Sequence, residues 1–170
     1  RLLVQVKHNI TFSADNEIFK DVIRAFWKDY TTPFFDKQKD RLIIAKSGLT
    51  KDERNHLKSL LNWAKTHATE KDFMTEVDRI KAKKNKLNDF RTVLKAENND
   101  TDLSDNELWE FLKCVDVLEY DFTNQNSVDE AYFLNLIKLS KNGRTTSNEK
   151  EIWDTILSFA SKLNKDGGSV

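Results

Sequence analysis

Two side chains near the start of the sequence have the types and spacing of half a nuclease site. Gln5 and Lys7 are separated by one residue in the largely apolar run "LLVQVK" (2–7). In a β-strand such a pair leaves the same face, so an amide oxygen and an ammonium would point into one cleft. An amide oxygen can bind a divalent metal ion, and a neighbouring lysine can contact a phosphate and the attacking water. The alternative is that the same alternation simply places both side chains in water.

The first 50 residues predict the unit that would hold this pair. The run 2–7 and a second run at 41–45, "RLIIA", favour two short strands. Between them, 16–30 carries apolar residues at helical spacing, with Ser13 or Asp15 as the expected N-cap. A helix between two strands predicts a βαβ unit in which 2–7 and 41–45 are neighbouring parallel strands.

From Thr50 onward the pattern becomes mostly helical. Three capping boxes, Thr50 with Glu53, Ser104 with Glu107 and Ser127 with Glu130, predict helix starts, because each side chain can bond the other's backbone N–H. A short strand is expected at 117–122, where helical spacing gives way to alternation. The predicted fold class is therefore α+β and mostly α-helical.

The chain is divided by its pattern into three parts. These are a strand–helix–strand unit (1–50), a helical connector (51–103) and a helical, winged-helix-like module (104–170). The last assignment rests on the order helix, strand, helix, helix, followed by a possible strand start at Ser169. One core cluster is expected in this module, made by Phe111, Leu112, Tyr120, Leu134, Ile137, Ile156 and Phe159.

Composition sets limits on partners and compartment. The 170 residues include 28 basic and 28 acidic side chains, so the whole chain has no dominant attraction to nucleic acid or to an anionic membrane. The single cysteine, Cys114, excludes an internal disulfide and fits a reducing compartment. No apolar run reaches the roughly 20 residues of a membrane helix, so we expect a cytoplasmic protein without a membrane partner. The abrupt start in a strand-like run, and the end "NKDGGSV", suggest a fragment.

Charge is unevenly distributed along the chain. Between Arg79 and Lys95 there are seven basic residues and one acidic residue, whereas 100–130 contains ten acidic residues and one basic residue. The two stretches could pair with each other or with neighbouring domains, or remain solvated helix faces. The basic stretch could contact phosphates, but it lacks the interleaved aromatic residues that stack on bases.

Other catalytic patterns are missing from the sequence. His8, His56 and His67 are too scattered for a zinc site. No Gly-x-Ser-x-Gly elbow and no Walker-type glycine-rich loop occurs, so we expect no cofactor within this chain.

Four stretches of the sequence resemble a bacterial multidomain family. They are "VQVKHNITFSADNEIFKDVIRAFWK", "DRLIIAKSGLT", "LSDNELWEFLKCVDVLEYDF" and "IWDTILSFASKLNKDGGSV", which together span nearly the whole chain. In that family a restriction-endonuclease-like domain of the PD-(D/E)XK superfamily precedes a helical connector and an NTPase region. Proteins of this arrangement are linked with antiphage defence.

The resemblance implies that Gln5 and Lys7 match the (D/E/Q)-x-K half of the nuclease motif. The helix at 16–30 and the strand at 41–45 would then be the last two elements of the nuclease core. The metal-binding aspartate is expected on a strand before residue 1. A single glutamine oxygen cannot hold a divalent cation, which takes about six oxygen ligands, so this chain alone is not expected to cut DNA. Mg²⁺ and ATP are expected only for the full-length protein.

The leading interpretation is a non-catalytic connector that couples a DNA-cleaving effector to an NTPase. Its partners would be the neighbouring domains of the same polypeptide, with DNA or oligomer formation at full length. One alternative is half of a metal-dependent nuclease site that is active only at full length. Another is a plain helical protein-interaction domain.

Overall fold

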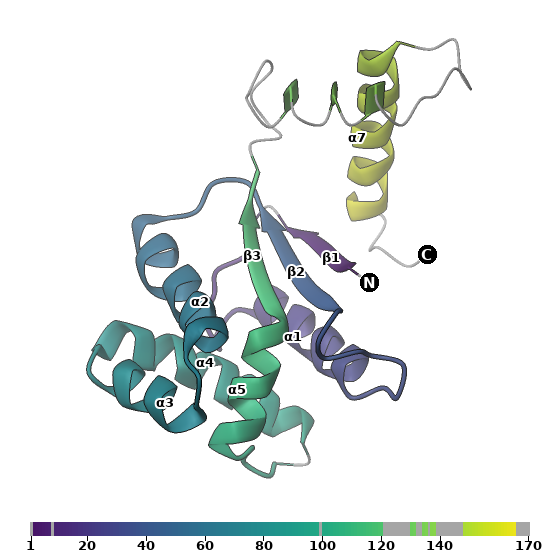
Figure 1. Cartoon of the computed structure of the whole chain (residues 1–170). Coiled ribbons are helices and arrows are strands. Elements are labelled where there is room, and N and C mark those ends of the chain that lie inside the picture. Colours follow the sequence, from purple (N-terminus) through teal and green to yellow (C-terminus); the bar gives the residue numbers. More distant parts are fainter. Residues whose placement is uncertain are drawn as a thin grey trace. The chain divides into compact units, whose positions relative to one another are not determined.

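Three parallel strands form the sheet around which the first part of the chain folds (Figure 1). The strands β1 (Leu2–Lys7), β2 (Arg41–Lys46) and β3 (Val115–Glu119) follow one another in that order across the sheet. The predicted parallel pairing of the first two strands is confirmed.

The computed structural model groups the chain into two compact units, residues 1–120 and 121–170. The unit 1–120 holds the sheet and most of the helices, and the second unit holds α7 (Glu149–Lys165). The residues that the structure describes are 2–7, 9–98, 100–120, 130–131, 134–135, 137–138 and 148–165.

The helix α1 (Glu17–Tyr30) connects β1 to β2. Its N-cap is Asn16, whose side-chain oxygen accepts the Phe19 N–H at 2.9 Å. The expected caps, Ser13 and Asp15, are therefore wrong by one to three residues, because an asparagine caps as well as either of them.

The remaining helices of the unit 1–120 share one hydrophobic core with the sheet. Leu42 and Ile44 of β2 and Val115 and Val117 of β3 enter this core from one face of the sheet. The helices are a π-helix η1 (Glu53–Lys58), then α2 (Ser59–Thr66), α3 (Glu70–Asp78), α4 (Lys81–Glu97) and α5 (Asp105–Cys114). The predicted α+β, mostly helical fold class is confirmed.

The third strand belongs to the same sheet as the first two. The strand expected at 117–122 lies at Val115–Glu119 and pairs with β2 in parallel. The sequence divided the chain at residues 50 and 103, whereas the structure groups 1–120 together, because their apolar side chains pack into one core. The winged-helix-like detail stays unconfirmed, and Ser169 and the Ser127 of the third capping box lie outside the described residues.

The expected cluster of seven residues is not found as one group among the described residues, since Tyr120, Leu134 and Ile137 are only half-buried. Phe111 and Leu112 are fully buried in the core of the unit 1–120. Ile156 is 47% exposed, so its assignment to a core was wrong. The side chain of Phe159 lies outside the described part. A helix stripe does not reveal which neighbour will cover it, and this explains the error at Ile156.

Candidate functional site

The carboxyl ends of the three parallel strands bring three charged residues into one row. Lys7 is the register partner of Lys46, and Lys46 is the register partner of Glu119. Residues paired across adjacent strands share a face of the sheet, so this row lies on the same face as the buried Ile44. Ligands of open α/β sheets bind outside the carboxyl ends of the strands, which makes this row the candidate site.

The pair that opened the sequence analysis lies on this face of β1. Leu3, Gln5 and Lys7 are half-buried, whereas Leu2 and Val4 leave the opposite face and are exposed. Alternation therefore does not place Gln5 and Lys7 in open water, because their face of the sheet is the one covered by the core. The Lys7 ammonium forms no ion pair and no hydrogen bond within the part of the chain that the structure describes.

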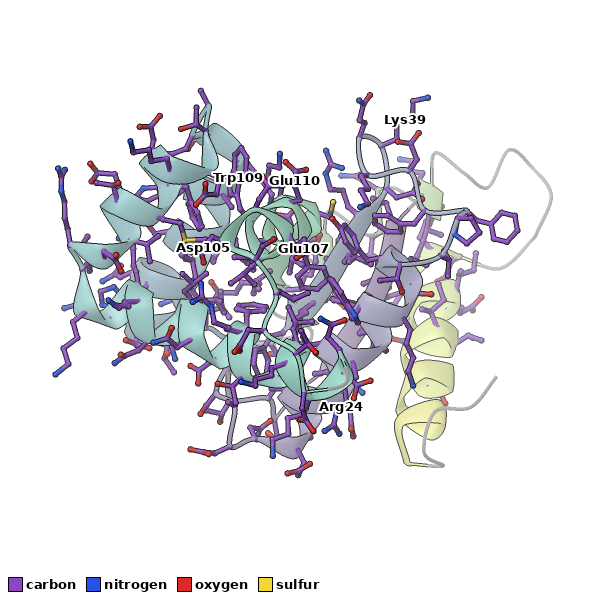
Figure 2. All side chains as sticks on the ribbon, turned by 90° about the horizontal axis from the view of Figure 1, so that it is seen from below. Arg24, Lys39, Asp105, Glu107, Trp109 and Glu110 are labelled. Carbon is purple, nitrogen blue, oxygen red and sulfur yellow. The ribbon has the colours of Figure 1, made fainter. Side chains whose placement is uncertain are left out.

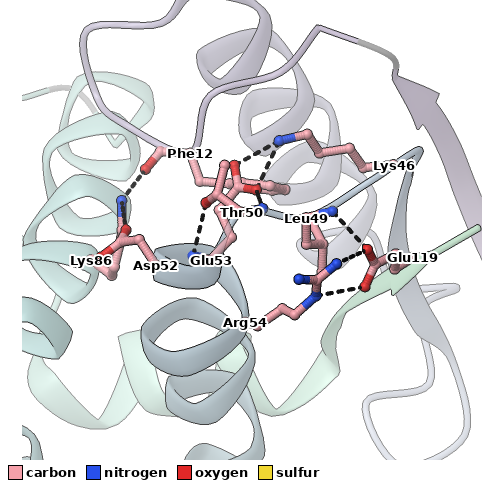
Figure 3. Close-up of polar contacts among 9 residues, drawn as sticks. All are labelled: Phe12, Lys46, Leu49, Thr50, Asp52, Glu53, Arg54, Lys86 and Glu119. Atoms are coloured by element: carbon pink, nitrogen blue, oxygen red, sulfur yellow. Dashed lines mark hydrogen bonds and ion pairs between the residues drawn. The ribbon is translucent and has the colours of Figure 1, made fainter.

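The middle lysine of the row is neutralised by a buried ion pair. Lys46 Nζ lies 2.7 Å from Glu53 Oε1 and 2.8 Å from Glu53 Oε2 (Figure 3). The two side chains are only 10% and 7% exposed. Glu53 also accepts the Thr50 N–H at 2.8 Å, and Thr50 Oγ1 accepts the Glu53 N–H at 3.2 Å, so the predicted capping box is confirmed. Lys7 is therefore the cation of the row that has no ion pair with any described residue.

The third member of the row, Glu119, is held by a loop and an arginine. The Arg54 Nε donates to Glu119 Oε2 at 3.0 Å, and the Leu49 N–H donates to Oε1 at 2.9 Å (Figure 3). These two hydrogen bonds, with that of Arg54 dominant, lower the pKa of Glu119 to about 2. Gly48 has a φ of 71°. A left-handed residue of this kind lets the chain turn sharply after β2, so that Leu49 can reach Glu119.

The basic and acidic stretches of the sequence partly neutralise each other. Arg91 Nη2 lies 2.6 Å from Asp105 Oδ1, and Lys95 Nζ lies 2.8 Å from Asp102 Oδ2. Asp105 stands at the start of α5, beside Glu107 (Figure 2). Of the possibilities left open by the sequence, pairing between the two stretches is the one observed at these positions.

Two further lysines of the basic stretch are turned inward. The Lys83 ammonium lies 3.9 Å from the centre of the Trp63 ring, and this lysine is only 6% exposed. The Lys86 ammonium donates to the Phe12 carbonyl at 3.0 Å and lies 3.4 Å from Asp52. The basic stretch therefore serves largely to join α4 to its neighbours, and we do not place the functional site there.

In the part of the chain that the structure describes, neither Cys114 nor the histidines gather into a site, and His8 lies outside that part. The Cys114 thiol is buried, and burial raises its pKa. Among the described residues, no group of three histidine, cysteine, aspartate or glutamate side chains could hold a metal ion. His67 instead contacts the Trp63 carbonyl, with 2.9 Å between Nδ1 and the oxygen.

Sequence reasoning missed three of the residues in this site. Lys46, Arg54 and Glu119 were not singled out, because their roles depend on which strands pair. The signal available was that a charged residue directly follows the apolar run at 41–45 and that another ends the run at 115–119. Charged residues at the ends of buried parallel strands are a reason to expect a site there.

Comparisons with known proteins give no family assignment. No protein-family model, no curated protein and no solved structure matches the chain. In the described part, no helix is both long enough and apolar enough to cross a bilayer. The resemblance to a nuclease–NTPase family thus stays a hypothesis that rests on the residues quoted above.

Proposed function

We propose that this chain closes the core of a metal-dependent DNA endonuclease and connects it to an NTPase region. The observation that carries the proposal is the placement of Gln5 and Lys7. They leave one half-buried face of β1 at the carboxyl end of a parallel sheet, and Lys7 has no partner among the described residues. A structural lysine in such a position would be expected to have a carboxylate beside it, as Lys46 has in Glu53.

The residues present do not by themselves fit a catalytic metal ion. Gln5 supplies one oxygen, whereas Glu53 and Glu119 are already committed to Lys46 and Arg54. A hard cation such as Mg²⁺ requires about six oxygen ligands, including waters. The acidic ligands would have to come from outside the described residues, and we derive no step through the metal.

The contribution of this chain is to handle the phosphate. The Lys7 ammonium would lie beside the scissile phosphate and offset the negative charge that develops on its oxygens. The Gln5 amide would donate to or accept from the water next to it, on the same face of the strand. Because Glu53 neutralises Lys46, the Lys7 ammonium is not repelled by the neighbouring lysine of the row.

The test is DNA cleavage by the full-length protein that contains this chain. With Mg²⁺ or Mn²⁺, Lys7→Ala should slow cleavage about 100-fold, the usual effect of removing one charge-stabilising donor. The control is Lys39→Ala, because this lysine is 81% exposed and precedes β2, at the opposite end of the sheet. Thermal unfolding should be the same for both variants. Equal cleavage rates for Lys7→Ala and wild type, or no cleavage by wild type, would contradict the proposal.

A plain protein-interaction domain is the second candidate, and one observation favours it. Leu2, Val4 and Val6 of the edge strand β1 are 65%, 51% and 46% exposed. Exposed apolar edge strands are sites where another chain can add to a sheet. The same cleavage assay separates the candidates, because an interaction domain predicts no dependence of any DNA cleavage on Lys7.

A further inference from the structure

An open, polar pocket of about 400 Å³ lies on the unit 1–120 and is separate from the Gln5–Lys7 pair. One wall comes from η1 and α2, and the other comes from β3. Its lining residues are Arg54, Lys58, Ser59, Leu61, Asn62, Lys65, Asp116 and Val117. Three of the eight are cations and one is an anion, and Glu119 pairs with one of the cations, so one positive charge remains in excess and the lining favours a negatively charged ligand.

Ion pairs across the pocket hold two of these cations in place without using all their donors. Arg54 pairs with Glu119, and Lys65 pairs with Asp116, so each cation bridges from the helical wall to β3. A guanidinium has five N–H groups, of which Arg54 gives two to Glu119, and an ammonium has three, of which Lys65 gives one to Asp116. Both cations are therefore oriented and still able to donate.

Lys58 lies between them in sequence and is uncommitted. It is exposed and forms no ion pair or hydrogen bond among the residues that the structure describes. It ends η1, and π-helical segments are rare and frequently occur at functional sites. From Arg54 to Lys65 the helical wall is about 16 Å long at 1.5 Å per residue. The cations thus form a row rather than a single point.

We propose that this pocket binds the phosphate backbone of a nucleic acid strand. Three cations spread over about 16 Å can meet about three successive phosphates of one strand. A single small anion would use only one end of the row. The inference rests on the proposed function in one respect: Arg54 contacts Glu119 of the candidate site, so a bound strand would continue toward Lys7.

The first experiment measures binding of a fluorescent DNA oligonucleotide to the full-length protein by anisotropy, without divalent metal. Lys58→Ala should weaken binding about threefold to tenfold and reduce the slope of log affinity against log salt by about one. The matched control is Lys51→Ala, which removes an exposed lysine from the same helical segment but outside the pocket lining. Equal effects of the two variants would overturn the proposal.

A second variant tests whether removing a negative charge from the pocket increases the affinity for DNA. Asp116→Asn removes the carboxylate that pairs with Lys65 and should tighten DNA binding, whereas a purely structural role would predict no gain. Asp21→Asn on α1 makes the same charge change outside the pocket and should leave binding unaltered. Equal tightening by both variants, or none by Asp116→Asn, overturns the proposal. Binding of inorganic phosphate at millimolar concentration, without any binding of DNA, also overturns it. The two proposals are tested by different readouts: Lys7→Ala by the cleavage rate at saturating DNA, and Lys58→Ala by DNA affinity without divalent metal.

Discussion

Replacing Glu53 by glutamine should destabilise the protein strongly, although the side chain keeps its shape. The carboxylate accepts two contacts from Lys46, at 2.7 and 2.8 Å, and one hydrogen bond from the Thr50 N–H. In Glu53→Gln the Lys46 ammonium stays in a site where it is only 10% exposed, without a counter-charge. Leaving one buried charge of a pair uncompensated costs about 3–5 kcal/mol.

We expect a loss of about 3 kcal/mol in the free energy of unfolding, the lower end of that range. The lower end applies because the glutamine oxygen can still accept one hydrogen bond. The measurement is urea unfolding followed by circular dichroism. The control is Glu17→Gln, since Glu17 lies at the same 2.7 Å from Lys20 but is 72% exposed. That variant should show no resolvable change, because exposed ion pairs contribute little.

A double variant separates the pair from its surroundings. Lys46→Met should also destabilise, because it strands the Glu53 carboxylate, but Lys46→Met/Glu53→Gln should cost less than the two single changes added together. A loss below about 1 kcal/mol for Glu53→Gln would refute the reasoning, since it would mean that the pair is hydrated. Additive effects would show that the two charges do not depend on each other.

Two further outcomes follow from the loop after β2 and its contact with β3. The pKa of Glu119 is lowered to about 2, so its stabilising contribution is complete above its ordinary pKa and is lost as the pH falls through about 2. Urea unfolding between pH 5 and pH 2 should therefore show a steeper loss of stability for wild type than for Glu119→Gln. Gly48→Ala should cost about 1 kcal/mol in the same assay at pH 7, because φ is 71° although no atom would meet the new Cβ.

The local features of this fold could be predicted from the sequence. Thr50 with Glu53 and Ser104 with Glu107 form capping boxes as expected, since such a box depends on residues only three positions apart. The parallel pairing of 2–7 with 41–45 was also predicted, because a single helix between two apolar runs leaves few other arrangements.

The non-local features could not be predicted in the same way. β3 follows β2 by 68 residues of mostly helical chain, and its alternation of side chains does not identify the strand beside it. The sequence pattern assigned this strand to the expected winged-helix-like module (104–170) and not to the sheet of the first two strands. The π-helix Glu53–Lys58, which carries Arg54 and Lys58, was not predicted, since the pattern after Thr50 indicated an ordinary helix.

The candidate site illustrates why residue type alone was insufficient. Lys7, Lys46 and Glu119 stand in one row, but two of them are committed to Glu53 and Arg54. A row of charges at the end of a buried sheet would repel or be poorly solvated unless most members were paired. Pairing of Lys46 with Glu53 and of Glu119 with Arg54 therefore stabilises the sheet end, and Lys7 on the edge strand is the member of the row without an ion-pair partner among the described residues. A phosphate at this edge would contact the Lys7 ammonium without first displacing a carboxylate, which is the condition that a phosphate-binding lysine must meet.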